Sequence, residues 1–509
     1  MLSNRHLLLA FSLAGSLCSP ARASDYYDAQ VNAVRLREVA VGDAVYKKVT
    51  VRLGQLQSLA QGEPQAALSS YSPTNGVLSI PFVRVGGTAV TNAAVTISDV
   101  LGVESAFALA TPLPSGETYG AFKAAVLAAW REIPRYIDPA SYQTQLRQME
   151  TSTTCFGFTS EDIIPSPRAS LSWRDGVHVP TLYPMRATRY ARVFERPPSF
   201  PEPFVRISVD ANTYAQNDLR ISQLRGALVD SLINLSTATP SAAIREQLRA
   251  TLLAYAQANA LSEGLLTNWS ATVTANTPVH FEVMPLTLNL IHAFSHVAPL
   301  LSTSERQIVG DWLHRLVSRV VASSWGTGKQ DNKAYYRSQV GLAWGLITGD
   351  SSLVRNAILI FKHAINEIRP DGSFVNESSR GGSANLYQSQ ATDSILSIAV
   401  ALEENLGLPA LSFQVNGKSV WTAAGRVVDA YFNQVGIASQ YGKSCEQGSF
   451  GTVTNPDSRW GTLQSISFLR VALKRDGLGA APARLRALPW DAYYYPEREG
   501  VDLISVLGD

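Results

Sequence analysis

The pattern of hydrophobic and polar positions changes twice along the chain. Residues 25 to about 105 alternate apolar and polar positions, with turn signals at Gly42-Asp43, Asn75-Gly76 and Gly86-Gly87. Alternation with a period of two and glycine-containing turns are typical of β-strands joined as hairpins. We therefore predict a β-rich module over residues 24–110.

This module contains a weak internal repeat. Residues 27–53 align with residues 71–97 at a constant offset of 44 residues, which pairs Leu36 with Ile80 and Gly42 with Gly86. One copy of so short a unit cannot bury its own apolar face, so two copies predict a small sandwich or barrel. No residue in it suggests catalysis, and structural support or glycan contact is its expected role.

A helical pattern and a proline-rich stretch make up residues 111–205. Phe122, Val126, Ala129 and Trp130 fall on one face of a predicted helix. Prolines then recur among aromatic and arginine residues up to about residue 205, which excludes regular helix. Long loops of this kind often line a functional site.

Amphipathic helices dominate the remainder, residues 206–509. Ser302 to Glu305 and Asp350 supply N-terminal caps. Many helices with short connections form antiparallel hairpins, which stack as an open solenoid or a closed toroid. The absence of a strict repeat disfavours a solenoid, so we expect a mainly α protein with an (α/α) toroid after the β-rich module. Predicted helices begin at about residue 219 and span 244–258, 284–300, 304–321, 338–346, 351–368 and 390–405.

The first 23 residues have the composition of an export signal. Arg5 and His6 precede the apolar run from Leu7 to Ala14, and Ala21-Arg22-Ala23 is an A-x-A cleavage site. We predict cleavage after Ala23 and a periplasmic or secreted protein. The run is too short to span a bilayer, and we expect no later stretch to be apolar for long enough to form a membrane helix.

Charge and cysteine content narrow the partners. The formal net charge is +2 at pH 7, which gives no global attraction to nucleic acid or membrane. An acidic partner must therefore be bound by a local cluster. After cleavage Cys155 and Cys445 remain, either as one disulfide or as two buried thiols. No zinc-ligand spacing occurs in the sequence.

One region concentrates chemically versatile side chains. It runs Asp331-Asn332-Lys333-Ala334-Tyr335-Tyr336-Arg337, and Asn376 to Arg380 and Tyr387 follow it. An amide, cations and phenols are the groups required to remove a proton beside a sugar carboxylate.

The same region resembles the alginate lyase superfamily, meaning polysaccharide lyase family five and its relatives with an (α/α) toroid. Residues 311–313 and 331–336 resemble the family's tryptophan–leucine helix and its Asn-Asn-His-Ser-Tyr-Trp signature. Residues 371–377 resemble its Asp-Gly-Phe-x-x-Asn-Glu turn. Arg380 and Tyr387 stand four and eleven residues after Asn376, where the family carries its catalytic arginine and tyrosine. The resemblance covers roughly residues 305–400 and implies an acidic polysaccharide as substrate.

The resemblance implies a carbon–oxygen lyase that cleaves a uronate polymer by β-elimination. The C5 proton is weakly acidic until donors neutralise the neighbouring carboxylate. Asn332 and Arg380 are suited to this task. Tyr387 would act as base and then as acid, since nearby cations stabilise phenolate. No metal or organic cofactor is implied.

Lys333 is where the chain departs from the family, which has a histidine there. A lysine could neutralise the carboxylate as a point charge or act as the base. Without that histidine, the simplest scheme is syn elimination by Tyr387 alone. That geometry suits mannuronate or glucuronate, whose H5 and O4 share a face, better than guluronate. Alginate rich in mannuronate, or glucuronan, is the expected substrate.

Other interpretations of these residues are open. Lys333 could be a solvated lysine, Arg380 could pair with Glu377, and Asn332 could be a helix N-cap. Tyr387 could pack in the core. The chain would then be a glycan-binding protein, and a glycoside hydrolase would need two opposed carboxylates instead.

A second group of side chains is assigned to substrate binding. Tyr335, Tyr336 and Arg337 would contact the sugar, unless the tyrosines belong to the core. His292 would touch substrate from a helix, although packing or a metal shared with His296 are alternatives. His178 would reach the site from the proline-rich loop.

Overall fold

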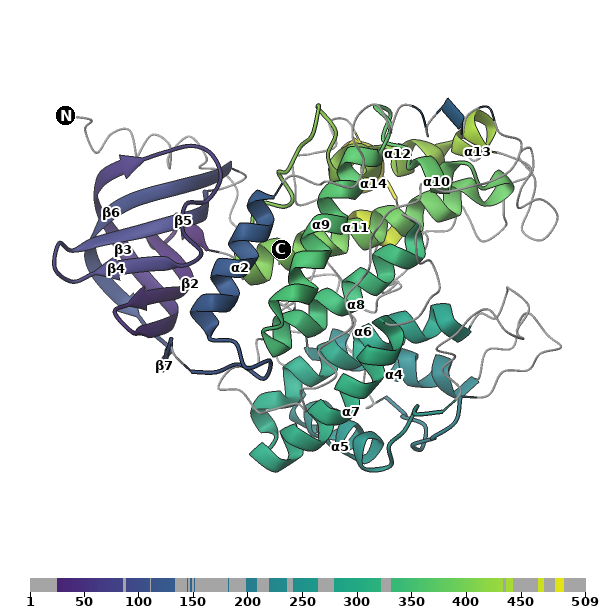
Figure 1. The fold of residues 1–509 in the computed structure, drawn as a ribbon, viewed down its shortest axis with the longest axis horizontal. Helices are drawn as coiled ribbons and strands as arrows, with labels where there is room; N and C mark the ends of the chain where they lie inside the picture. Colours follow the sequence, from purple (N-terminus) through teal and green to yellow (C-terminus); the bar gives the residue numbers. More distant parts are fainter. Residues whose placement is uncertain are drawn as a thin grey trace.

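The computed structural model comprises a small β-module and a larger helical body, with α2 (Tyr119–Arg131) packed between them (Figure 1). His178, Cys155, Cys445 and the predicted signal lie outside the described residues. The described residues are 25–85, 88–109, 111–132, 144, 147–148, 151, 182, 198–207, 219–235, 241–263, 279–321, 331–433, 436–442, 466–470 and 481–488.

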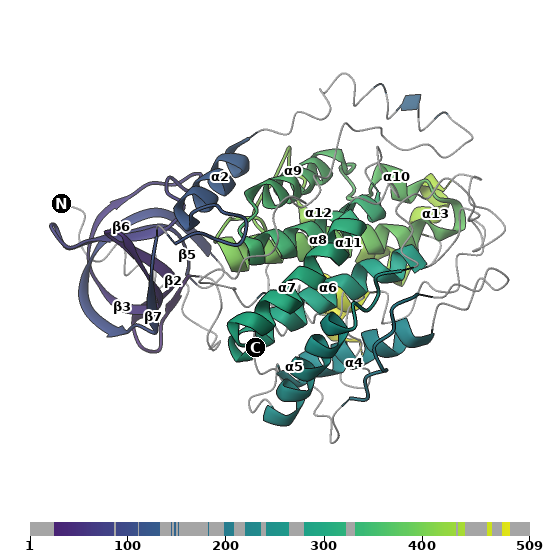
Figure 2. The same ribbon diagram turned by 60° about the horizontal axis from the view of Figure 1, so that its bottom comes forward.

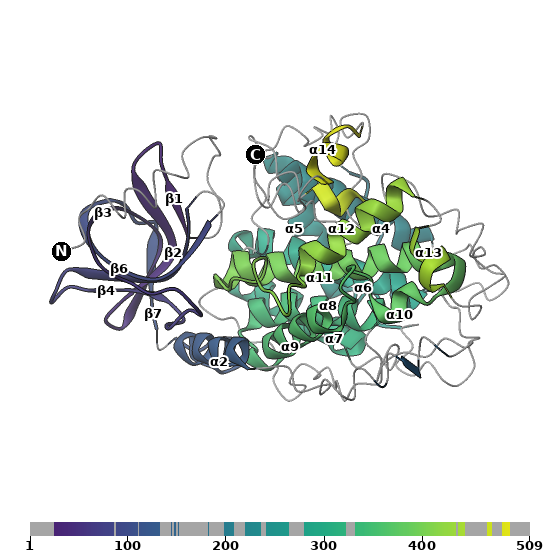
Figure 3. The same ribbon diagram turned by 90° about the horizontal axis from the view of Figure 1, so that it is seen from above.

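Seven strands of the β-module form one strongly curled sheet (Figure 3). β2 and β5 begin 44 residues apart, as do β3 and β6, so the strands follow the spacing of the sequence repeat. β1 pairs with β2 and β5, and β4 pairs with β5 and β2, so each copy lends a strand to the other. The strands are β1 (Tyr26–Asp28), β2 (Ala33–Val41), β3 (Ala44–Leu59), β4 (Ser69–Ser72), β5 (Val77–Val85), β6 (Thr88–Gly102) and β7 (Ser105–Ala108).

The helical body confirms the mainly α fold with a β-rich N-terminal module, and toroidal closure stays a prediction. Both predicted caps are present: Ser302 exchanges hydrogen bonds with Glu305 in the first turn of α7, and Asp350 caps α9. The helices are α4 (Leu219–Leu235), α5 (Ala242–Gln257), α6 (Val279–Val297), α7 (Thr303–Val321), α8 (Asn332–Thr348), α9 (Ser351–Glu367), α10 (Val375–Ser378), α11 (Ala384–Leu406), α12 (Val420–Phe432), α13 (Gly436–Tyr441) and α14 (Ala481–Arg486), with short 3-10 turns η1 (Ala298–Leu300) and η2 (Gly381–Ser383).

Helix α8 lies at the centre of the body, packed against α6, α7, α9 and α11 (Figure 2). Nearly all of its residues are buried, polar ones included. A helix enclosed on all sides has no polar face to reveal its extent. For this reason the sequence pattern placed its start at residue 338, six residues too late.

Helix α6 is apolar enough to overturn one expectation from the sequence. By length and composition alone, the stretch Val283–Leu300, which runs from α6 through η1, would pass for a membrane span, although no later stretch was expected to. In the folded protein 83% of that stretch is buried. Its apolar residues therefore serve the core of the helical body.

Buried charges join the two parts of the molecule. Arg84 on β5 forms an ion pair with Glu403 on α11. Glu38 on β2 accepts a hydrogen bond from Tyr119 and lies 3.5 Å from the Lys123 amine, both on α2. A cavity of about 50 Å³ lies at this junction. The β-module is thus docked by paired charges that would be costly to leave alone.

Candidate functional site

The candidate site is built around the first turn of α8, which Asp331 caps. Its carboxylate accepts the backbone N–H groups of Lys333 and Ala334 at 3.1 and 3.2 Å. Asn332 is consequently the first residue of the helix and not its cap. The cap leaves the Asn332 side chain available for other contacts.

Asn332 is held by two neighbours from different elements. Its backbone N–H donates to Glu377 Oε1 on α10 at 2.5 Å. Its side-chain Nδ2 donates to Gln390 Oε1 on α11 at 2.7 Å. The Asn332 side chain is buried, and among the described residues its Oδ1 finds no hydrogen-bond partner. An amide fixed in this way presents its remaining groups in one orientation.

Arg380 brings Glu377 and Tyr387 together. One guanidinium nitrogen lies 3.2 Å from Glu377 Oε2, the pairing that one sequence interpretation foresaw. The guanidinium carbon also lies 3.5 Å from the centroid of the Tyr387 ring. Such contacts between a cation and an aromatic face are attractive. Arg380 thus contacts both the carboxylate and the phenol.

Glu377 is fully buried beneath this arrangement. Burial raises its pKa to about 7, although the charge of Arg380 opposes the rise. Asp331 raises the pKa further by repulsion, while the Asn332 N–H and Lys333 lower it. The carboxyl group therefore changes charge close to neutral pH.

Lys333 and Arg380 are the cations of the site that solvent reaches. The Lys333 side chain is 23% exposed, with its amine 3.7 Å from Asp331 Oδ2, and that of Arg380 is 13% exposed. Tyr387, which lies against Arg380, is half-buried. A negatively charged ligand would meet these side chains first.

The side chains assigned to substrate binding lie deeper. Tyr335 and Tyr336 belong to the hydrophobic core, and the Tyr335 ring packs against Phe374. Arg337 is also buried, which lowers its pKa to about 10 against the opposing effect of Asp331. In this structure neither tyrosine offers a ring face to a sugar, because α8 is enclosed by other helices.

His292 is a buried residue of α6. Burial, with a smaller effect of His296, lowers its pKa to about 3, so it is neutral at ordinary pH. No cluster of three or more His, Cys, Asp or Glu side chains suited to a metal occurs in the part of the chain that the structure describes. The described residues thus offer these histidines no metal site.

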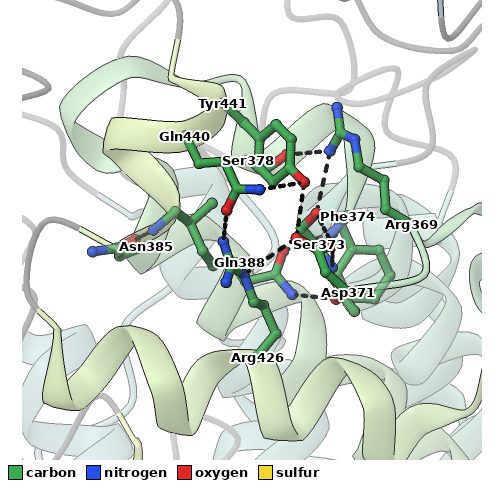
Figure 4. Close-up of polar contacts among 12 residues, drawn as sticks. Arg369, Asp371, Ser373, Phe374, Ser378, Asn385, Gln388, Arg426, Gln440 and Tyr441 are labelled. Carbon is green, nitrogen blue, oxygen red and sulfur yellow. Dashed lines mark hydrogen bonds and ion pairs between the residues drawn. The ribbon is translucent and has the colours of Figure 1, made fainter.

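A second polar cluster shapes the turn that leads into α10 (Figure 4). Asp371 accepts hydrogen bonds from Ser373 at 2.7 and 3.0 Å and from the Tyr441 hydroxyl at 2.9 Å. Burial alone would raise the pKa of Asp371, but these hydrogen bonds lower it. Arg369 stacks on Tyr441 and donates to Ser378 at 2.7 Å. This cluster anchors the segment just before and within α10.

Gln388 attaches the same turn to α11. Its side chain accepts the Phe374 N–H at 2.7 Å and donates to the Gly372 carbonyl at 3.0 Å. Because Gln388 follows Tyr387 directly, the turn before Glu377 and the helix carrying Tyr387 are held in register.

Sequence reasoning missed Glu377 and Gln390 as members of the site. Glu377 was visible in the motif but was considered only as a partner of Arg380. Gln390 stands three residues after Tyr387, a spacing that places both on one helix face. That spacing was the one available signal.

These features describe a helical protein with cations and a phenol at the candidate site, and part of the chain matches a known family. Residues 279–436 match the family model of alginate lyases, and this segment contains Asn332, Lys333, Arg380 and Tyr387. The relationship to the alginate lyase superfamily predicted from the motifs is confirmed. The match also supports the prediction of a polysaccharide lyase.

Similar solved structures are alginate lyases too. A tyrosine-to-phenylalanine variant of alginate lyase A1-III with a tetrasaccharide has 21% identity and a TM-score of 0.47, covering 63% of this chain and 89% of its own. A histidine-to-alanine variant with a tetrasaccharide has 21% identity and a TM-score of 0.46, with coverages of 63% and 88%. The enzyme from Sphingomonas species A1 has 18% identity and a TM-score of 0.43, with coverages of 79% and 97%. No curated protein matches the chain.

Proposed function

We propose that this protein cleaves a uronate-containing acidic polysaccharide, of the polymannuronate or glucuronan type, by β-elimination. The observation that carries the proposal is the position of the Arg380 guanidinium, whose carbon lies 3.5 Å from the centroid of the Tyr387 ring. Arg380 also pairs with Glu377, which accepts the backbone N–H of Asn332 at the start of α8. An amide, a guanidinium and a phenol from three elements are thus linked through Glu377.

Each group has a role in the proposed reaction. Lys333 and Arg380 would neutralise the substrate carboxylate, with Asn332 as a further donor, so that negative charge can develop at C5. Tyr387 would remove the C5 proton, because an adjacent guanidinium stabilises the phenolate. The C4–O4 bond breaks as the C4–C5 double bond forms, and Tyr387 returns the proton to O4.

Substrate preference follows from having one base on one face of the sugar. Tyr387 alone can serve both H5 and O4 only where they lie on the same side of the ring, as in mannuronate and glucuronate. We therefore expect these polymers to be cleaved faster than guluronate blocks. Equal rates on both kinds of block would contradict this preference.

The test is an absorbance assay for the unsaturated product with mannuronan, guluronan and glucuronan. Wild-type protein should raise the absorbance, and Tyr387→Phe should abolish the rise without unfolding. Tyr255→Phe is the matched control, since its hydroxyl donates to the Pro201 carbonyl at 2.9 Å in another part of the core. Reducing ends without absorbance would indicate a hydrolase, and binding without either product would indicate a glycan-binding protein.

A further inference from the structure

The residues of the proposed site are linked in a closed ring of contacts. Asn332 is bonded to Glu377, Glu377 to Arg380, and Arg380 lies on Tyr387. Gln390, on the same helix as Tyr387, accepts a hydrogen bond from the Asn332 side chain and so closes the ring. Two of these five residues, Glu377 and Gln390, have no part in the proposed chemistry.

We propose that Glu377 and Gln390 are positioning residues, which hold the amide of Asn332, the guanidinium of Arg380 and the phenol of Tyr387 in register. This inference rests on the proposed function and adds to it the residues on which the site geometry depends. It also assigns a pH dependence to that geometry.

Glu377 is suited to this role because its two oxygens serve two elements. Oε1 accepts from the first N–H of α8, and Oε2 pairs with Arg380, three residues further along the chain. Its complete burial removes competing water, so both contacts are stronger than on a surface. Without this carboxylate, Arg380 would lose its ion pair with α10 and keep its contact with the Tyr387 ring.

The charge state of Glu377 couples the ring to pH. The charged groups that act on it are Arg380 from the turn after α10, Asp331 from the cap of α8 and Lys333 from its first turn, and Tyr387 of α11 lies against Arg380. Since burial raises its pKa to about 7, the ion pair with Arg380 is complete above that pH and weakens below it. Activity that needs a fixed Arg380 should therefore rise through about pH 7.

Gln390 fixes the other end of Asn332. It is a neutral residue, so its contact with Nδ2 does not change with pH. Removing it should loosen the amide while leaving the pairing of Glu377 with Arg380 in place. The two positioning residues therefore predict different pH behaviour when each is replaced.

The kinetic experiment compares wild type, Glu377→Gln, Gln390→Ala and the control Glu367→Gln across a pH series. Glu367 is a buried glutamate of α9, 3.5 Å from His363 and outside the ring. Misplacement of catalytic groups by about 1 Å costs on the order of 10²-fold in rate. Glu377→Gln should lose kcat on that scale with KM within about threefold, and should lose the rise through neutral pH. Gln390→Ala should lose kcat but keep the rise.

A second measurement is independent of activity. Hydrogen exchange of the Asn332 amide should be about tenfold or more faster in Glu377→Ala than in wild type or Glu367→Gln, because its acceptor is gone. If wild type cleaves no uronate polymer but this protection holds, the proposed function fails and the ring stands. If wild type is active and Glu377→Gln keeps its kcat and pH profile, the positioning role is refuted and the proposed function stands. Unchanged exchange in Glu377→Ala overturns the ring itself.

Discussion

Replacing Arg84 with methionine should destabilise the whole protein through the junction between its two parts. The Arg84 side chain is 8% exposed and that of its partner Glu403 is 1% exposed. Removing one member of a buried ion pair costs about 3–5 kcal/mol, since the other charge stays buried. Glu403 keeps one hydrogen bond, from the Leu411 N–H at 2.9 Å. We therefore expect a loss near the lower limit, about 3 kcal/mol.

Urea unfolding of four variants measures this loss: Arg84→Met, Glu403→Gln, the two combined, and Arg52→Met. Arg84→Met gives the single cost, and adding Glu403→Gln should recover part of it, because a neutral amide no longer needs the arginine. Arg52→Met is the matched control on the β-module, since Arg52 and Asp99 are 49% and 52% exposed and such pairs contribute at most about 1 kcal/mol. A cost for Arg84→Met no larger than for Arg52→Met would refute the reasoning. So would purely additive losses in the double variant.

Three further predictions concern the candidate site. Gly372→Ala should cost about 2 kcal/mol or more in denaturant unfolding, because its φ is +88° and a Cβ would lie 2.1 Å from the Thr422 carbonyl oxygen; a neutral effect would mean that the turn shifts freely. Gln388→Leu should cost about 2 kcal/mol or more, since the Phe374 N–H and Gly372 carbonyl would lose their partner; full retention of stability would show that this link is dispensable. Burial raises the pKa of Glu377 from 4.5 to about 7, so the stability it contributes is complete below pH 4.5 and is lost as pH rises through about 7. As the pH rises from 4.5 to about 7, the unfolding free energy of Glu377→Gln relative to wild type should therefore increase by roughly 3 kcal/mol. A difference in stability independent of pH would contradict the shifted pKa.

Much of the secondary structure was predictable because its signals are local. The alternation and the repeat of the β-module correspond to strands at the same spacing. The caps at Ser302 and Asp350 mark the beginnings of α7 and α9. Asn332, Lys333, Arg380 and Tyr387 were named from their resemblance to the family motifs, and their catalytic roles stay predictions. Capping and amphipathic period act within a few residues, so the chain alone reveals them.

Helix α8 shows where that locality ends. The early start of α8 and the burial of its Tyr335 and Tyr336 depend on the surrounding helices, and so does the burial of His292 on α6. No local pattern describes these neighbours. The same holds for Gln390, which matters only because α11 lies beside the first turn of α8.

By itself, then, the sequence determined the two-part organisation, several helix limits and the chemical groups proposed for the site. Only the tertiary structure decided which of those groups meet solvent, that Glu377 and Gln390 complete the ring, and that Arg84 pairs with Glu403 across the junction. The physical reason is that burial and charge pairing depend on neighbours distant in the chain. Those neighbours are chosen when the helices and the β-module pack.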